Sequence, residues 1–203
     1  MFPAQNRVPT DYTWNGEAFV RRQREQNRSE TVDGLGVVLG AYTADMSDLS
    51  ERLRDGTISL EDWEAEMIAL VMMIHLTSTA LAVGGWEQMT SADTLAAQEA
   101  GQSQVEYLIL FAIAIAAGTV VLDGRFLARV RLYGQAGRGT YWSTVGRVMG
   151  ASGYTQEQRV LHPADHCRDC VEYADRGWQA IGTLPTIGDS QCRSNCRCSF
   201  EYR

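Results

Sequence analysis

All five cysteines of this 203-residue chain lie within its last 37 residues. They are Cys167, Cys170, Cys192, Cys196 and Cys198, spaced as Cys-x2-Cys-x21-Cys-x3-Cys-x-Cys. A Cys-x2-Cys pair presents two thiolates from one tight turn, and a second cluster roughly twenty residues later supplies the other ligands of a tetrahedral Zn²⁺. We therefore predict a zinc site. Cys167, Cys170, Cys192 and Cys198 are the preferred ligands, and Cys196 is the next choice.

A metal ion would also compensate for the small core of this segment. Few apolar residues lie between the two cysteine groups, so a metal can supply stability that a hydrophobic core cannot. Disulfides are the alternative, although five cysteines leave one thiol unpaired. His166 and His162 are candidate substitutes for a cysteine ligand. Sites made of cysteine alone are usually closed and structural, so we expect no enzymatic activity.

The composition excludes several chemistries. All 18 basic residues are arginine, so a Walker A lysine and a Schiff-base lysine are ruled out. The glycine-rich stretches GLGVVLG (34–40) and YGQAGRGTYW (133–142) are therefore predicted to be close-packing positions or helix breaks. The net charge is −7, and residues 101–203 carry 11 arginines and 9 acidic residues. So small a basic surplus does not by itself indicate a nucleic-acid surface.

The elements that must position the cysteines are predominantly helical. Residues 10–162 contain no proline, and apolar residues recur at helical spacing. We predict helices over 17–28, 29–54, 59–83, after Ser91, over 107–122 and over 125–149. Ser59 is the predicted N-cap of the third helix, with Asp62 three residues later. His75, in the apolar part of that helix, is predicted to be a core residue.

The apolar run over 107–122 has 16 residues, whereas a membrane-spanning helix needs about 20. We interpret this run as a buried core helix or an oligomer-interface helix. A membrane-active segment is the alternative.

The predicted fold class is mainly α. We expect an extended arm over 1–16, an α-helical body over 17–150, and a small irregular, zinc-knuckle-like, cysteine-rich module over 151–203. The N-terminal residues show no apolar stretch of signal-peptide length, so an intracellular protein with reduced thiols is expected.

The C-terminal sequence resembles the signature of phage minor head proteins of the Mu F-like head-morphogenesis family. That signature has a Cys-x2-Cys pair, a middle rich in glycine and proline, and a terminal Cys-Arg-Cys. The matching positions are Cys167, Cys170, Pro185, Cys196, Arg197 and Cys198. The helical stretches from residue 56 onward resemble such proteins less specifically. The family often has a His-Pro pair shortly before its Cys-Arg-Cys, whereas this chain has SQCRSNCRC, in which Cys192 would take over as a ligand.

The resemblance implies a structural protein of the virion, assembled in the host cytoplasm. Its expected partners are the capsid or portal proteins of the same particle, together with further copies of itself. A membrane partner is not expected.

Two other functions are kept as alternatives. A zinc-knuckle protein that binds nucleic acid would use Trp178 and Tyr202 for base stacking, and its arginine contacts would be Arg168, Arg176, Arg193, Arg197 and Arg203. A membrane-active DNA-delivery protein would use residues 107–122.

Overall fold

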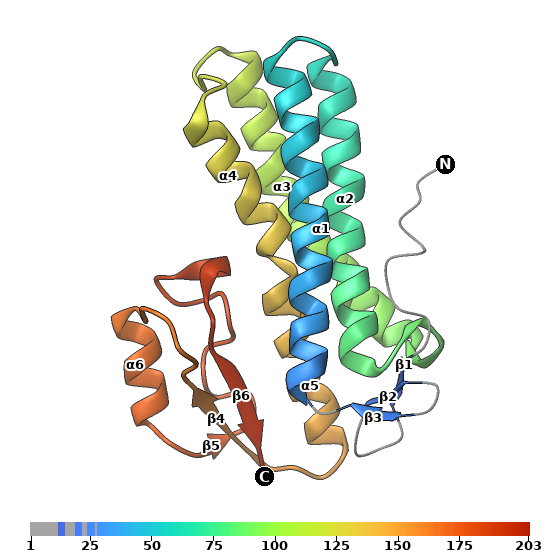
Figure 1. Cartoon of the computed structure of the whole chain (residues 1–203), viewed down its shortest axis with the longest axis vertical. Helices are drawn as coiled ribbons and strands as arrows, with labels where there is room; N and C mark the ends of the chain where they lie inside the picture. The colour runs from blue at the N-terminus through green and yellow to red at the C-terminus, as the bar shows by residue number, and fades with distance from the viewer. Residues whose placement is uncertain (1–11, 15–18, 22–23, 27) are drawn as a thin grey trace.

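The body of the protein is a bundle of long helices. This computed structural model describes residues 12–14, 19–21, 24–26 and 28–203. The helices of the body are α1 (Arg28–Arg54), α2 (Leu60–Val83), α3 (Ser91–Ala116), α4 (Gly124–Gln135) and α5 (Gly137–Ala151). Helices α1 to α4 lie side by side along the long axis, and α5 lies at the lower end of the bundle (Figure 1). The predicted mainly α class is confirmed.

The helix ends follow the local sequence. Ser59 caps α2, because its hydroxyl accepts a hydrogen bond from the Asp62 backbone N–H at 3.0 Å. Gly84 ends the same helix with a φ of 102°, a left-handed conformation that glycine adopts without strain. Thr90 and Asp93 form a reciprocal capping box at the start of α3, after the short 3-10 helix η2 (Trp86–Gln88). The predicted cap at Ser59 is confirmed.

Aromatic side chains from three helices form the centre of the core. The Trp63 ring lies 6.1 Å from that of Phe111 and 5.9 Å from that of Phe126, and all three are almost completely buried. The Trp63 indole donates a hydrogen bond to the Ser50 hydroxyl at 2.9 Å, so its buried ring nitrogen has a hydrogen-bond partner. This cluster joins α2, α3 and α4, with α1 completing it through Ser50.

The two glycine-rich stretches differ in their packing. A Cβ at Gly137 would lie 2.6 Å from the Ile74 side chain, and one at Gly134 would overlap Thr43. The prediction of close packing is therefore confirmed for the second stretch. It is wrong for the first, because a Cβ at Gly34, Gly36 or Gly40 would meet nothing within 4 Å.

The N-terminal prediction requires correction. A helix was predicted over 17–28, but residues 19–21 and 24–26 form the strands β2 (Phe19–Arg21) and β3 (Arg24–Gln26). They pair antiparallel with each other, and β2 also pairs with β1 (Tyr12–Trp14). Dense charge is compatible with an exposed strand as well as an exposed helix, so charge alone does not separate the two. The rest of the predicted arm over 1–16 lies outside the described residues.

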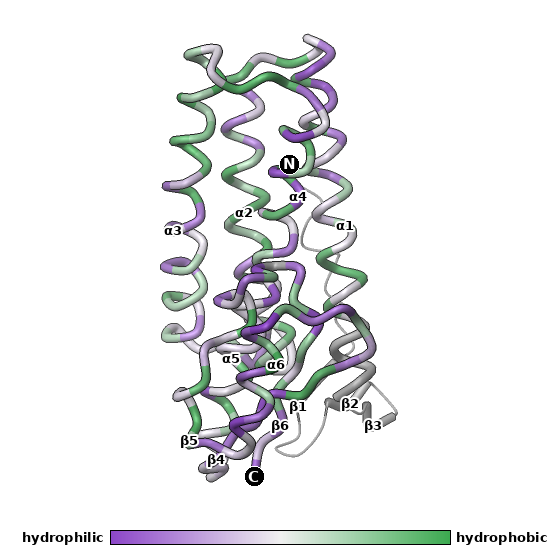
Figure 2. Tube along the Cα trace, turned by 90° about the vertical axis from the view of Figure 1, so that its left-hand side faces the viewer, coloured by the Kyte–Doolittle hydropathy of each residue, from purple (hydrophilic) through white to green (hydrophobic). Residues whose placement is uncertain are grey.

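The apolar run over 107–122 does not form one helix. Helix α3 ends at Ala116, and Val120–Leu122 lie in the following loop. Leu108, Phe111 and Ala112 face the core. Their neighbours are exposed: Tyr107 to 62%, Leu110 to 63% and Ile113 to 59%. Figure 2 shows this half of α3 at the edge of the bundle and largely hydrophobic.

The helix predicted over 125–149 is in fact two helices. Helix α4 ends at Gln135 and α5 begins at Gly137, with Ala136 as the shared cap. The break allows Gly137 to lie against α2, where no side chain would fit. A basic amphipathic pattern continues through the break, so sequence periodicity did not reveal it.

The C-terminal module contains regular structure where an irregular segment was predicted. Strands β4 (Gln156–Val160), β5 (Gln179–Ala180) and β6 (Ser199–Tyr202) form an antiparallel sheet with β4 in the middle. The short elements α6 (Arg168–Asp175) and η3 (Arg193–Asn195) complete the module. Its sheet packs on α5, where the Phe200 ring lies 6.1 Å from that of Trp142. The module and the body therefore share one hydrophobic core.

One described helix, α2, has the length and apolar composition of a membrane span. Most of its apolar stretch is buried inside the bundle, and a central core helix has the same composition.

Candidate metal site

Local structure brings the first two cysteines together. Cys167 is the extended residue that precedes α6, and Cys170 lies in the first turn of that helix. The remaining three lie on the returning chain: Cys192 and Cys196 flank η3, and Cys198 directly precedes β6. The Gln191 backbone N–H donates to the Asp169 carboxylate at 2.9 Å, which ties the returning chain to α6.

The sulfurs of the two segments converge. The Cys192 Sγ lies 3.5 Å from the Sγ atoms of both Cys167 and Cys170, and the Cys170 Sγ lies 3.6 Å from that of Cys196. A tetrahedron with zinc–sulfur bonds of about 2.3 Å has sulfur–sulfur edges of about 3.8 Å. A disulfide bond is only about 2.05 Å long, and all five thiols are free. The cluster could therefore hold a metal ion.

The five thiols fall into two groups that share one member. Cys167, Cys170 and Cys192 have sulfurs within 4.8 Å of one another, and so do Cys170, Cys196 and Cys198. Cys170 belongs to both groups and is completely buried. It is consequently the centre of the cluster.

Polar side chains surround the sulfurs. The Ser190 hydroxyl lies 3.2 Å from the Cys192 Sγ and 3.4 Å from the Cys170 Sγ. The buried guanidinium of Arg159 donates to the Cys196 Sγ at 4.0 Å and to the Pro185 carbonyl oxygen, and it lies over the Phe200 ring. Donors and positive charge around thiolates stabilise their negative form, which is the form that binds metal.

The thiols differ in their readiness to lose a proton. The side-chain hydrogen bond with Cys198 lowers the pKa of the Cys196 thiol to about 4. Burial raises the pKa of Cys192 to about 12 and also raises that of Cys170. A metal ion that binds here at neutral pH must therefore displace protons from buried thiols.

The two histidines differ in their surroundings. The Nδ1 atom of His166 lies 3.7 Å from the Cys198 Sγ, so His166 is adjacent to the cluster. The Nε2 atom of His162 instead lies 2.7 Å from the Ser199 hydroxyl.

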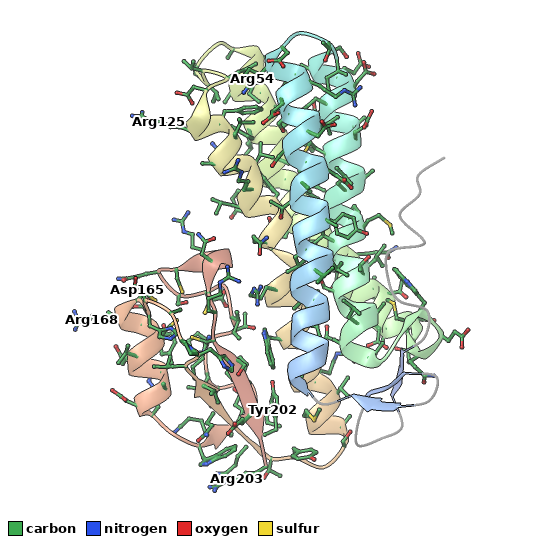
Figure 3. The ribbon with its side chains drawn as sticks, viewed as in Figure 1. Arg54, Arg125, Asp165, Arg168, Tyr202 and Arg203 are labelled. Carbon is green, nitrogen blue, oxygen red and sulfur yellow. The ribbon has the colours of Figure 1, made fainter. Side chains whose placement is uncertain are left out.

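The basic residues considered for nucleic-acid contact are placed unevenly. Arg168, Arg193 and Arg197 are exposed on the module, and Figure 3 shows Arg168 pointing away from the helical body. The Trp178 ring is covered by the Arg203 guanidinium, whose carbon lies 4.5 Å from the ring centroid. Tyr202 is buried between the module and the body (Figure 3). Base stacking by Tyr202 would require the module to move.

The chain was compared with protein-family models, curated proteins and solved structures. None of them matches. The arrangement of the cysteines is therefore the basis for any statement about function.

Sequence reasoning did not find Arg159 or Ser190. Strand β4 alternates between half-buried and buried positions, and Glu157 and Arg159 occupy the buried ones. The Glu157 carboxylate accepts hydrogen bonds from the backbone N–H groups of Gly182 and Leu184, which fixes the loop ahead of the second cysteine group. Alternation between buried and half-buried residues could have indicated that β4 is a strand. The buried positions carry charged residues, however, so the sequence shows no alternating apolar pattern.

Proposed function

We propose that this protein is a non-enzymatic structural component of a phage virion whose C-terminal module is stapled by one structural Zn²⁺. Thiolate-only sites are typical of structural zinc, because four sulfurs complete the coordination and leave no position for water. The convergence of cysteine sulfurs from two segments supports the zinc site, and the resemblance of the C-terminal cysteine signature to that of phage minor head proteins supports the virion role. The proposed ligands are Cys167, Cys170, Cys192 and Cys196, whose sulfurs are connected by contacts of 3.5 to 3.6 Å.

The fifth thiol, Cys198, is assigned a supporting role. Its sulfur lies near His166, Cys196 and Cys170, and the residue is buried directly before β6. In this assignment Cys198 supports Cys196 by hydrogen bonding and does not bind the metal. The ligands preferred from the sequence included Cys198, and the set proposed here has Cys196 in its place.

The exposed apolar face of α3 supports a role in assembly. Tyr107, Leu110 and Ile113 are each more than half exposed along the outer edge of the bundle. Contiguous apolar surface on a protein commonly marks an interaction site. We propose this face as the contact with neighbouring subunits of the particle, whether capsid or portal proteins or further copies of the chain.

The test uses protein purified from assembled particles. We expect one zinc per chain by elemental analysis and five titratable thiols after denaturation without reductant. The variant Leu110→Glu should still bind zinc but fail to enter particles, whereas Glu106→Gln, on the same helix, should enter normally. Absence of the chain from particles would overturn the virion role, and two disulfides with no metal would overturn the staple.

Binding to nucleic acid is the second candidate. The exposed arginines of the module favour it, but residues 151–203 carry seven acidic residues against six arginines. Binding to DNA that weakens steeply with added salt, and that Arg168→Gln and Arg197→Gln reduce, would favour this candidate over the structural one.

A further inference from the structure

A cavity of about 720 Å³ lies between the helical body and the C-terminal module. Its walls come from α3, from the junction of α4 and α5, and from residues 186–193. No cysteine lines it, so it is separate from the metal site. Its volume lies within the range of about 300–1,000 Å³ that is typical of small-molecule sites.

The lining of this cavity is positively charged. Arg129, Arg138 and Arg193 are among the residues that line it, and Asp189 is the acidic residue among them. Arg129 lies over the Phe111 ring at 3.9 Å, and its side chain also interacts with the Tyr133 hydroxyl. The lining thus has an excess of about two positive charges.

Arg138 is a buried cation without a carboxylate. Its side chain is only 6% exposed, and no acidic residue in the described part of the chain forms an ion pair with it. The charged groups that act on it are the Arg197 guanidinium and the Cys196 sulfur. A buried cation without a carboxylate partner is costly, so it is retained most readily where an anion binds beside it.

The backbone at the cavity also favours an anion. Helix α5 begins at Gly137 without a side-chain cap, and its first turn, Arg138 to Thr140, lines the cavity. The start of a helix presents N–H groups and a partial positive charge. On the opposite wall, Arg193 has a φ of 47°, an uncommon conformation for a residue other than glycine.

We propose that this cavity binds a small molecule that carries a phosphate monoester. A phosphate monoester has a charge of about −1.5 to −2 at neutral pH, which balances the excess of the lining, whereas one carboxylate does not. Arg138 and Arg193 bind the phosphate from opposite walls. The remainder of the molecule contacts the apolar and aromatic lining, which includes Leu132 and Tyr133. This activity is additional to the proposed virion role and does not depend on it.

Titration calorimetry on the zinc-loaded full chain tests this proposal, with inorganic phosphate, AMP and acetate as probes. We expect phosphate and AMP to bind, with AMP the tighter because it also contacts the apolar lining, and acetate to bind much more weakly. Arg138→Met should weaken AMP binding by about 10- to 100-fold, because it removes a charge-assisted hydrogen bond. Arg168→Met, at an exposed arginine outside the cavity, should leave binding unchanged. Absent binding of both phosphate and AMP, or equal binding by Arg138→Met and the parent, would overturn the proposal.

A second measurement separates ligand binding from a structural role of Arg138. In buffer without phosphate, Arg138→Met should melt at the same temperature as the parent or higher, because it removes a buried charge that has no carboxylate partner. If Arg138 instead neutralises the cysteine thiolates, the variant will melt lower and release zinc more readily, and the proposal is wrong. Arg193→Asn serves where Arg138→Met does not fold, because asparagine tolerates the left-handed backbone at this exposed position. It too should weaken AMP binding, and unchanged affinity would count against the site.

Discussion

The sulfurs of Cys170 and Cys192 lie 3.5 Å apart, although 21 residues separate them in the chain. The intervening chain forms α6 and β5 and returns alongside β4 before it reaches Cys192. Cys170 is also 3.6 Å from Cys196, so one buried sulfur joins both cysteine groups. This one sulfur therefore connects the start of α6 with both ends of η3.

Cysteine substitutions should distinguish the cysteines that bind zinc from a cysteine that only lies beside the metal site. Cys170→Ser should abolish zinc binding and unfold residues 156–203, because it removes the sulfur shared by both groups. Cys198→Ser should retain one zinc per chain, with a loss of stability of about 1–2 kcal/mol from the altered buried hydrogen bond. Elemental analysis and hydrogen exchange of the module would measure both effects. Loss of zinc in Cys198→Ser, with retention in Cys196→Ser, would show that the two roles are reversed.

Arg159 should be needed for metal affinity. Arg159→Met keeps the apolar stem but removes the donors to the Cys196 sulfur and the Pro185 carbonyl oxygen. We expect zinc affinity to fall by about 10- to 100-fold, as is typical when outer-shell partners of a metal ligand are removed. Competition with a chromophoric chelator would measure it, and Arg168→Met, which is exposed, is the control. Equal zinc affinity in the two variants would show that Arg159 acts only in packing.

Two glycine substitutions should have opposite effects on stability. Gly137→Ala should destabilise the protein by about 1–3 kcal/mol, because its Cβ would overlap Ser78 and Ile74 on α2 and the Leu39 side chain on α1. Gly36→Ala, on exposed α1 surface with nothing within 4 Å of the new Cβ, should stabilise it by about 0.5–1 kcal/mol. Urea unfolding followed by circular dichroism would measure both. A stabilising Gly137→Ala would mean that α2 and α5 are packed less closely than the structure shows.

His75 should make the protein sensitive to acid. It is buried on α2, its Nδ1 lies 2.6 Å from the Thr140 hydroxyl, and burial lowers its pKa from 6.5 to about 4. The neutral ring is therefore the folded form, whereas the unfolded chain takes up a proton below pH 6.5. The free energy of unfolding should fall as the pH drops from about 6.5 to 4, by roughly 3 kcal/mol in total, and should be unaffected by His75 above this window.

The matched test compares pH slopes, because acid also releases metal from thiolates. His75→Gln should show a shallower fall in the free energy of unfolding than the parent between pH 6.5 and 4. His162→Gln, which changes an exposed histidine, should follow the parent. Identical slopes in all three proteins would show that His75 does not titrate differently in the folded and unfolded states.

The sequence by itself determined the helical class, the cap at Ser59 and the set of cysteines. Helical periodicity and cap chemistry are local, so they can be read without knowing what packs against them. The break at Ala136 could not be predicted in this way, because it accompanies the close approach of Gly137 to α2, which is a contact between distant residues. The strands over 19–26 were also missed, since a charged stretch fits either an exposed helix or an exposed strand.

Only the tertiary structure decided which groups surround the sulfurs. Cysteine spacing indicated a metal site, but spacing does not fix which sulfurs meet, and the structure places the Cys170 sulfur beside those of Cys192 and Cys196. Arg159 and Ser190 reach the cluster because antiparallel pairing and the returning loop place them there. The cavity with Arg138 likewise forms where two parts of the chain meet. Contacts between residues far apart in sequence depend on how the elements pack, and no local pattern encodes that packing.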